Sequence, residues 1–220
     1  MHLLFDLDGT LTDSSPGIVR CINHALVALQ REPVAERDVM TMIGAPLSDI
    51  FATLLGTTDP ATIEAAIAAY RVRFNDVGIF ENALFPGIAE ALAEFRQLGH
   101  SLQIVTNKPS VSARRVIDHF DIARFFDAVH GPDLTNRACR KTDLVGEALR
   151  AVAGSADRAA MIGDRPEDIL AARSHAIPGV AVGWGYGSRQ ELLDAQPAFV
   201  AENTAALVAW VATFATQANA

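Results

Sequence analysis

Residues 2–10 read HLLFDLDGT, and this stretch decides the fold class. The run His2–Phe5 has the length and composition of a strand that is buried on both faces, and it leads directly into Asp6, Asp8, Gly9 and Thr10. Similar short apolar runs follow at Leu102–Val105, Ala159–Ile162, Val180–Val182 and, more weakly, Phe199–Val200. Helix-length amphipathic segments separate these runs. The alternation predicts an α/β fold in which helices cover a parallel sheet.

One stretch interrupts the alternation. Residues 15–82 contain helical stripes of apolar residues and no predicted strand. The two long stripes are Ile18, Ile22, Leu26, Leu29 and Ile63, Ile67, Tyr70, Phe74, Val77. We therefore expect a small helical domain at residues 15–82, inserted into an α/β core of residues 1–14 and 83–220. In the alternative interpretation, the same helices simply cover the sheet.

The composition excludes several classes of protein. The chain has 220 residues, of which 50% are hydrophobic and 20% are charged, so it is not intrinsically disordered. A net charge of −8 argues against a nucleic-acid binder. Cys21 and Cys139 show no zinc-type spacing, which favours a reducing compartment, and we expect the cytoplasm. No apolar run approaches the roughly 20 residues that span a bilayer, and the first residues lack the pattern of a signal peptide, so no membrane partner is expected.

Polar side chains follow three of the predicted strands. They are Asp6 and Asp8 after the first strand, Thr106, Asn107 and Lys108 after Leu102–Val105, and Asp164 and Asp168 after Ala159–Ile162; Lys141 opens the helix between the last two strands. In open α/β sheets, ligands bind beyond the carboxyl ends of the strands, so we expect these groups to meet at one edge. Clustered carboxylates need a cation, and such hard oxygen ligands suit Mg²⁺. Hydroxyl, amide and ammonium groups beside them are donors for a phosphate. The set points to phosphoryl transfer.

Four motifs resemble those of the haloacid dehalogenase superfamily. They are FDLDGTLTDS at residues 5–14, VTNK at 105–108, Lys141, and IGDRPEDI at 162–169, in matching order over essentially the whole chain. The resemblance implies a Rossmann-like parallel sheet core. The insert resembles the C1-type helical cap of the phosphoglycolate phosphatase branch.

The resemblance also implies roles for the site residues. Asp6 would be the nucleophile that forms an aspartyl-phosphate, and Asp8 would be the general acid and base. Mg²⁺ would be held by Asp6, Asp8 through its backbone carbonyl, Asp164 and, directly or through water, Asp168. Phosphate oxygens would be bound by Thr106, Asn107 and Lys141.

Some assignments stay open. Proline often follows the lysine of the third motif, but Thr142 stands here, and Arg137 and Arg140 are rival cations. Lys108 either contacts phosphate or lies on the surface beside the site. The run GWGYG at residues 183–187 is expected to form a loop at the same edge, with or without contact to substrate or cap.

The expected activity is a Mg²⁺-dependent phosphatase for a small phosphorylated metabolite, with phosphoglycolate favoured. The alternatives are a nucleoside 5′-monophosphate phosphatase and a β-phosphoglucomutase-like phosphomutase. A 2-haloacid dehalogenase is disfavoured because Asp8 stands where that branch has no second carboxylate. A binding protein on an inactive scaffold is disfavoured by the complete acidic set. The sequence leaves the exact substrate open, and also the choice between monomer and homodimer.

Overall fold

The computed structural model describes residues 1–133, 139–152 and 158–217. The chain forms two compact units. We call Met1–Asp13 together with Leu84–Ala220 the core unit, and Ser14–Ala83 the insert unit. The chain passes between them at two short paired strands, β2 (Thr12–Asp13) and β3 (Ala83–Leu84).

A parallel sheet organises the core unit. In the described residues it has six strands in the order β5-β4-β1-β6-β7-β8. Their bounds are β1 His2–Phe5, β4 Ser101–Val105, β5 Ala128–His130, β6 Ala159–Gly163, β7 Gly179–Val182 and β8 Phe199–Ala201. The five predicted strands are confirmed, and β5 is an additional strand at the edge. The central strand is β1, since Phe5 pairs with Ile104 on one side and Ile162 on the other.

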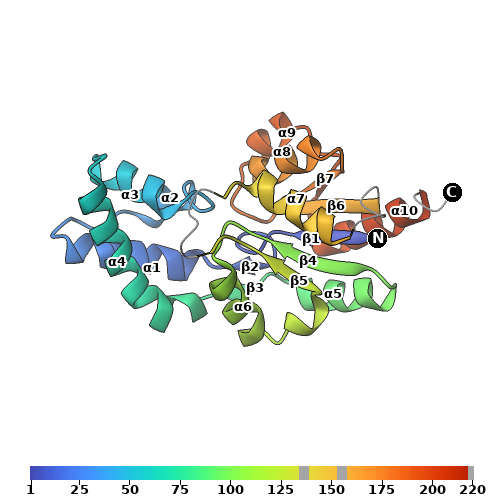
Figure 1. Cartoon of the computed structure of the whole chain (residues 1–220), viewed down its shortest axis with the longest axis horizontal. Coiled ribbons are helices and arrows are strands. Elements are labelled where there is room, and N and C mark those ends of the chain that lie inside the picture. Colours follow the sequence, from blue (N-terminus) through green and yellow to red (C-terminus); the bar gives the residue numbers. More distant parts are fainter. Residues whose placement is uncertain (134–138, 153–157, 218–220) are drawn as a thin grey trace. The chain divides into compact units, whose positions relative to one another are not determined.

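Helices cover both faces of this sheet. Their bounds are α5 Ile88–Gln97, α6 Ser110–His119, α7 Lys141–Ala151, α8 Pro166–Ser174, α9 Arg189–Asp194 and α10 Thr204–Gln217, with a 3₁₀ turn η2 at Ala123–Phe125. Figure 1 shows α7, α8 and α9 on one side of the sheet and α5 and α6 on the other. The α/β fold class with a Rossmann-like parallel sheet is therefore confirmed. In the part of the chain that is described, none of the helices has both the length and the apolar character that a membrane crossing needs.

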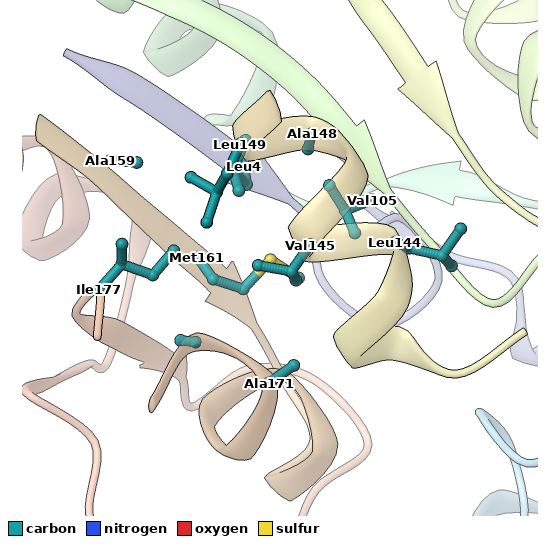
Figure 2. Packing of buried hydrophobic residues seen from close by; sticks show 11 residues of the cluster. Leu4, Val105, Leu144, Val145, Ala148, Leu149, Ala159, Met161, Ala171 and Ile177 are labelled. Atoms are coloured by element: carbon teal, nitrogen blue, oxygen red, sulfur yellow. The ribbon is translucent and has the colours of Figure 1, made fainter. Parts of the chain in front are cut away.

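The sheet is buried on both faces. On one face, Leu4 of β1 and Met161 of β6 belong to one cluster with Val145 of α7 and Ala171 of α8 (Figure 2), and all four residues are almost fully buried. On the other face, the ring of Phe5 stacks on that of Phe95 in α5, with 6.1 Å between ring centroids. Each such large apolar side chain stabilises the fold by about 1.5–3 kcal/mol when it leaves water. The packing therefore fixes β1, and with it the residues that follow β1.

The insert unit is helical. Its elements are α1 Ser15–Ala28, α2 Glu36–Met40, α3 Leu47–Leu55, α4 Pro60–Asp76 and the 3₁₀ turn η1 Gly78–Phe80. Helix α4 contacts both α1 and α3, and α1 also contacts η1. Gly17 permits the last contact, because a Cβ atom there would lie 2.1 Å from the carbonyl oxygen of Gly78. Arg73 joins α4 to the following turn through two hydrogen bonds to the Glu81 carboxylate, at 2.6 and 3.0 Å.

Some residues at helix ends differ from the sequence prediction. Val77 belongs to a predicted apolar stripe, but it lies just beyond α4 and is 46% exposed. Two further apolar residues at helix ends, Leu98 just beyond α5 and Val111 in the first turn of α6, are about half exposed. Val77 and Leu98 follow the last helical residue, so the helical period that would place them on the buried face no longer applies.

Candidate active site

The site forms at the carboxyl edge of the three central strands. Asp6 follows β1, Thr106 follows β4, and Asp164 follows β6. The backbone N–H of Asp6 donates to the carbonyl oxygen of Ile162 at 2.9 Å, so the β1–β6 pairing holds the start of the Asp6 loop. As predicted from the parallel topology, residues far apart in sequence meet at this edge.

Three carboxylates form the centre of the site. Oxygen atoms of Asp6, Asp164 and Asp168 lie within 4.8 Å of one another, and all three residues are buried. Burial, together with the charges of Asp6 and Asp168, raises the pKa of Asp164 to about 8. Burial raises the pKa of Asp168 to about 6, against the opposing effect of Lys141. Like charges in a buried place favour protonation unless a cation compensates them.

Lys141 supplies part of that compensation. It is the first residue of α7, and its Nζ lies 2.8 Å from Asp6 Oδ1 and 2.9 Å from Asp168 Oδ1. The same Nζ donates to the carbonyl oxygen of Val105 at 3.0 Å. Burial alone would lower the pKa of Lys141, but the charges of Asp168 and Asp6 outweigh it and raise the pKa. Lys141 is therefore a buried cation fixed between two carboxylates.

Arg140 and Arg137 were the alternatives to Lys141 as the cation of the site. Arg140 is exposed, and it precedes α7 with its backbone N–H donating to Asp143 Oδ2 at 3.2 Å. Arg137 lies outside the described residues.

Lys108 pairs with Asp8. Its Nζ lies 2.8 and 2.5 Å from the two carboxylate oxygens of Asp8. The two side chains are only 6% and 15% exposed, respectively, so the interpretation of Lys108 as a surface residue is wrong. Contact of Lys108 with phosphate stays a prediction.

The loop after β1 closes tightly over Asp164. Gly9 has φ of +86°, a conformation that side chains disfavour, and a Cβ atom there would lie 2.3 Å from Asp164 Oδ2. The next residue, Thr10, donates its hydroxyl to Asp164 Oδ1 at 2.9 Å. A glycine is thus required at position 9, both for the turn and for the close approach.

The residues predicted to bind phosphate lie at the end of β4. Thr106 is buried, its backbone N–H donates to the carbonyl oxygen of His130 at 2.9 Å, and its hydroxyl accepts from the N–H of Lys108 at 3.2 Å. Asn107 is exposed beside it. Their location is as expected, and their roles towards phosphate stay predictions.

One set of contacts with Asp164 was not predicted from the sequence. The backbone N–H of Tyr186 donates to Asp164 Oδ2 at 2.9 Å, and the indole N–H of Trp184 donates to the carbonyl oxygen of Thr10 at 3.0 Å. The available signal was the glycine spacing of GWGYG directly after β7, which lies next to β6 in the sheet.

The residues present fit a divalent cation. The three carboxylates each bring an oxygen within 4.8 Å of the others, and such clustered hard oxygen donors are the ligands that Mg²⁺ takes. When ionised, the four aspartates of the site exceed its two lysines by two formal charges. Both the oxygen donors and the charge balance therefore suit a doubly charged ion.

Comparison with known proteins places the chain among phosphate-processing enzymes. It is 37% identical over 206 residues to a protein of Pseudomonas aeruginosa named 5′-nucleotidase, covering 94% of this chain and 93% of the relative. It is 36% identical over 192 residues to a phosphoglycolate phosphatase of Caulobacter vibrioides, covering 84% and 79% of the two chains, respectively.

Two solved structures have the same fold. A predicted phosphatase from Clostridium acetobutylicum superposes with a TM-score of 0.89 at 32% identity, covering 96% of this chain and 98% of that one. Protein Tyrosine Kinase A of Mycobacterium tuberculosis superposes with a TM-score of 0.81 at 34% identity, covering 96% and 97%, respectively. The family description that matches residues 3–182 is haloacid dehalogenase-like hydrolase, and the chain therefore belongs to this family.

Proposed function

We propose that the protein is a Mg²⁺-dependent phosphatase that hydrolyses a small phosphate monoester through an aspartyl-phosphate on Asp6. The observation that carries this proposal is the placement of Asp6. Its carboxylate lies 2.8 Å from the Lys141 ammonium and within the cluster formed with Asp164 and Asp168. A carboxylate can attack a phosphate dianion only when nearby cations reduce the repulsion between them.

Asp6, Asp164 and Asp168 are the side chains that would hold Mg²⁺, together with the backbone carbonyl of Asp8. Bound there, Mg²⁺ would neutralise charge on the phosphate and on the attacking carboxylate. Thr106, Asn107 and Lys141 would donate to the phosphate oxygens, and Lys141 is already fixed by its three partners.

The reaction takes two steps. In the first, a carboxylate oxygen of Asp6 bonds to phosphorus, the bond from phosphorus to the ester oxygen breaks, and Asp8 gives its proton to the leaving oxygen. In the second, Asp8 takes a proton from water, the water oxygen bonds to phosphorus, and the bond to Asp6 breaks. Inorganic phosphate leaves, and both aspartates return to their starting state.

Phosphoglycolate is the favoured substrate, and the relative named phosphoglycolate phosphatase, at 36% identity, supports this choice. A nucleoside 5′-monophosphate is the second candidate, supported by the relative named 5′-nucleotidase at 37% identity. The insert unit Ser14–Ala83 would act as the cap that selects between them. A phosphomutase would need to keep water away from the aspartyl-phosphate.

The test is phosphate release with Mg²⁺ and with EDTA, from phosphoglycolate, nucleoside 5′-monophosphates, glucose 1-phosphate and p-nitrophenyl phosphate. We expect turnover only with Mg²⁺, and best with phosphoglycolate. The Asp6→Asn variant should keep the fold and lose turnover, because the amide lacks the nucleophilic charge. Asp118→Asn, at an exposed aspartate of α6, is the matched control. Full activity in EDTA would contradict the role of the metal, and activity of Asp6→Asn within tenfold of wild type would contradict that of the nucleophile.

A further inference from the structure

The segment Gly183–Gly187, which we call the Trp–Tyr loop, has no role in the chemistry above. It follows β7 and carries the sequence GWGYG. Nevertheless, it contacts both the buried carboxylate of Asp164 and the loop that bears Asp6 and Asp8. These contacts point to a role in metal binding.

The backbone of the Trp–Tyr loop helps to fix the Asp164 carboxylate. The N–H of Tyr186 donates to Oδ2 at 2.9 Å, and the hydroxyl of Thr10 donates to Oδ1 at 2.9 Å. Each oxygen thus has one hydrogen bond that sets its direction and keeps further lone-pair capacity. A carboxylate oriented in this way is prepared to bind a cation.

The glycines of the loop allow this close approach. A Cβ atom at Gly185 would lie 2.2 Å from Asp164 Cβ and 2.4 Å from the carbonyl oxygen of Gly9. A Cβ atom at Gly187 would lie 2.1 Å from the carbonyl oxygen of Asp164. Glycine is therefore required at positions 185 and 187 for the loop to lie this close to Asp164 and to the backbone of Gly9.

The two aromatic side chains tie the Trp–Tyr loop to the segment after β1. The Trp184 indole N–H donates to the carbonyl oxygen of Thr10 at 3.0 Å. The Tyr186 hydroxyl donates to Asp13 Oδ1 at 3.1 Å. Thr10 is the residue whose hydroxyl binds Asp164, so the hydrogen bonds form a closed circuit around this carboxylate.

We infer that Trp184 and Tyr186 are positioning residues for the divalent cation: they hold Asp164 and the Asp6–Asp13 loop in the arrangement that binds it. The inference rests on the proposed function, because it takes the ion to bind at Asp164. Substitution of groups that orient metal ligands typically weakens metal affinity by about 10–100-fold. Tyr186→Phe keeps the phenyl ring and removes the hydroxyl that donates to Asp13, whereas Trp184→Phe keeps an aromatic ring but replaces the indole by a smaller phenyl group and removes the N–H that donates to Thr10.

The chain offers a matched control for each variant, since it contains two tryptophans and two tyrosines. Trp184→Phe is compared with Trp210→Phe, whose indole stacks between Phe199 and Phe214 in another part of the core unit. Tyr186→Phe is compared with Tyr70→Phe in the insert unit. Mg²⁺ affinity is measured from the shift of Tm with Mg²⁺ concentration, and Tm in EDTA reports the stability of the fold.

We expect Trp184→Phe and Tyr186→Phe to bind Mg²⁺ about tenfold more weakly than wild type, with Tm in EDTA unchanged and kcat recovered at saturating Mg²⁺. The two controls should bind Mg²⁺ as wild type does. In the Trp210→Phe protein, Trp184 is the remaining tryptophan, and its emission should change as Mg²⁺ binds.

Wild-type Mg²⁺ affinity in both Trp184→Phe and Tyr186→Phe would overturn the inference and leave the proposed function intact. A lower Tm in EDTA with unchanged affinity would likewise overturn it, since this is the result of a purely structural role. Unchanged Trp184 emission at saturating Mg²⁺ would also count against it. Failure of the wild-type protein to bind Mg²⁺ would overturn the inference together with the metal role in the proposed function.

Discussion

The chain contains only two lysines, Lys108 and Lys141, among 18 basic residues, and both are buried against site aspartates. All other basic positions carry arginine. A lysine ammonium is a compact point charge with three rotatable donors, whereas a guanidinium is a wide planar fork. Lys141 uses this geometry to reach Asp6, Asp168 and a backbone carbonyl from one atom. The site therefore uses the compact ammonium group of lysine, which a guanidinium would not replace at Lys141.

Lys108→Met should lower kcat strongly and leave the fold intact. The substitution keeps an unbranched side chain of similar size but removes the ammonium group that contacts both oxygens of Asp8. Since general acid–base catalysis contributes roughly 10²–10⁴-fold, we expect a loss of about 10²-fold when Asp8 is misplaced. Lys108→Arg should recover only part of the activity. Steady-state phosphate release measures the effect, and the exposed Arg140, changed to Met, serves as control. A kcat near that of wild type in Lys108→Met would show that the pair does not position Asp8.

At the scale of elements, the apolar runs predicted five strands of the large sheet, and β5 and the two-residue strands β2 and β3 were not predicted. Ala128–His130 is only three residues long and is defined by its pairing with β4, which local composition does not reveal. Part of the site could be predicted from the order of the strands. Strand order brings Asp6 and Asp164 together, so their meeting follows from the topology. The partner of Lys108 depends on side-chain packing, which one sequence does not encode in any local pattern.

Contacts between elements also decide how much a glycine-to-alanine substitution destabilises the insert unit. Gly17→Ala would drive a Cβ atom of α1 into the backbone of η1, 2.1 Å from the Gly78 oxygen. Overpacking of this kind costs about 1–3 kcal/mol, and rigid backbone on the other side places Gly17→Ala at the upper end. Gly56→Ala is the control, because that residue has φ of +62° with open space around it, and only the backbone strain of about 1–2 kcal/mol applies. Urea unfolding measures the free energy of unfolding of both variants. A smaller decrease for Gly17→Ala than for Gly56→Ala would contradict the packing of α1 on η1.

For the whole molecule, the buried carboxylates make stability depend on pH. Without metal, the pKa of Asp164 is about 8 and that of Asp168 about 6, both above the ordinary 3.8. At a pH between these values and 3.8, the folded protein therefore keeps protons that the unfolded chain has released. The bound protons stabilise the folded state, and this contribution to the free energy of unfolding is lost as pH rises through 6 and 8. We expect Tm in EDTA to fall between pH 6 and 8.5, and Mg²⁺ to reduce the fall. Asp164→Asn should flatten the dependence, whereas a wild-type Tm that rises over this range would contradict it.

The central position of β1 has a consequence for synthesis on the ribosome. β1 precedes both of its partners in the chain, since β4 begins at Ser101 and β6 at Ala159. β1 therefore stays without either of these partners until β4 has been translated, and one of its edges stays unpaired until β6 has been translated. The insert unit, by contrast, lies within Ser14–Ala83, and α1 finds its partners α4 and η1 inside this segment, so its helices can pack before β4 and β6 are made. We therefore expect the insert to fold during translation, whereas the edge that carries Asp6 and Asp164 is complete only after the segment that follows β7 has been synthesised.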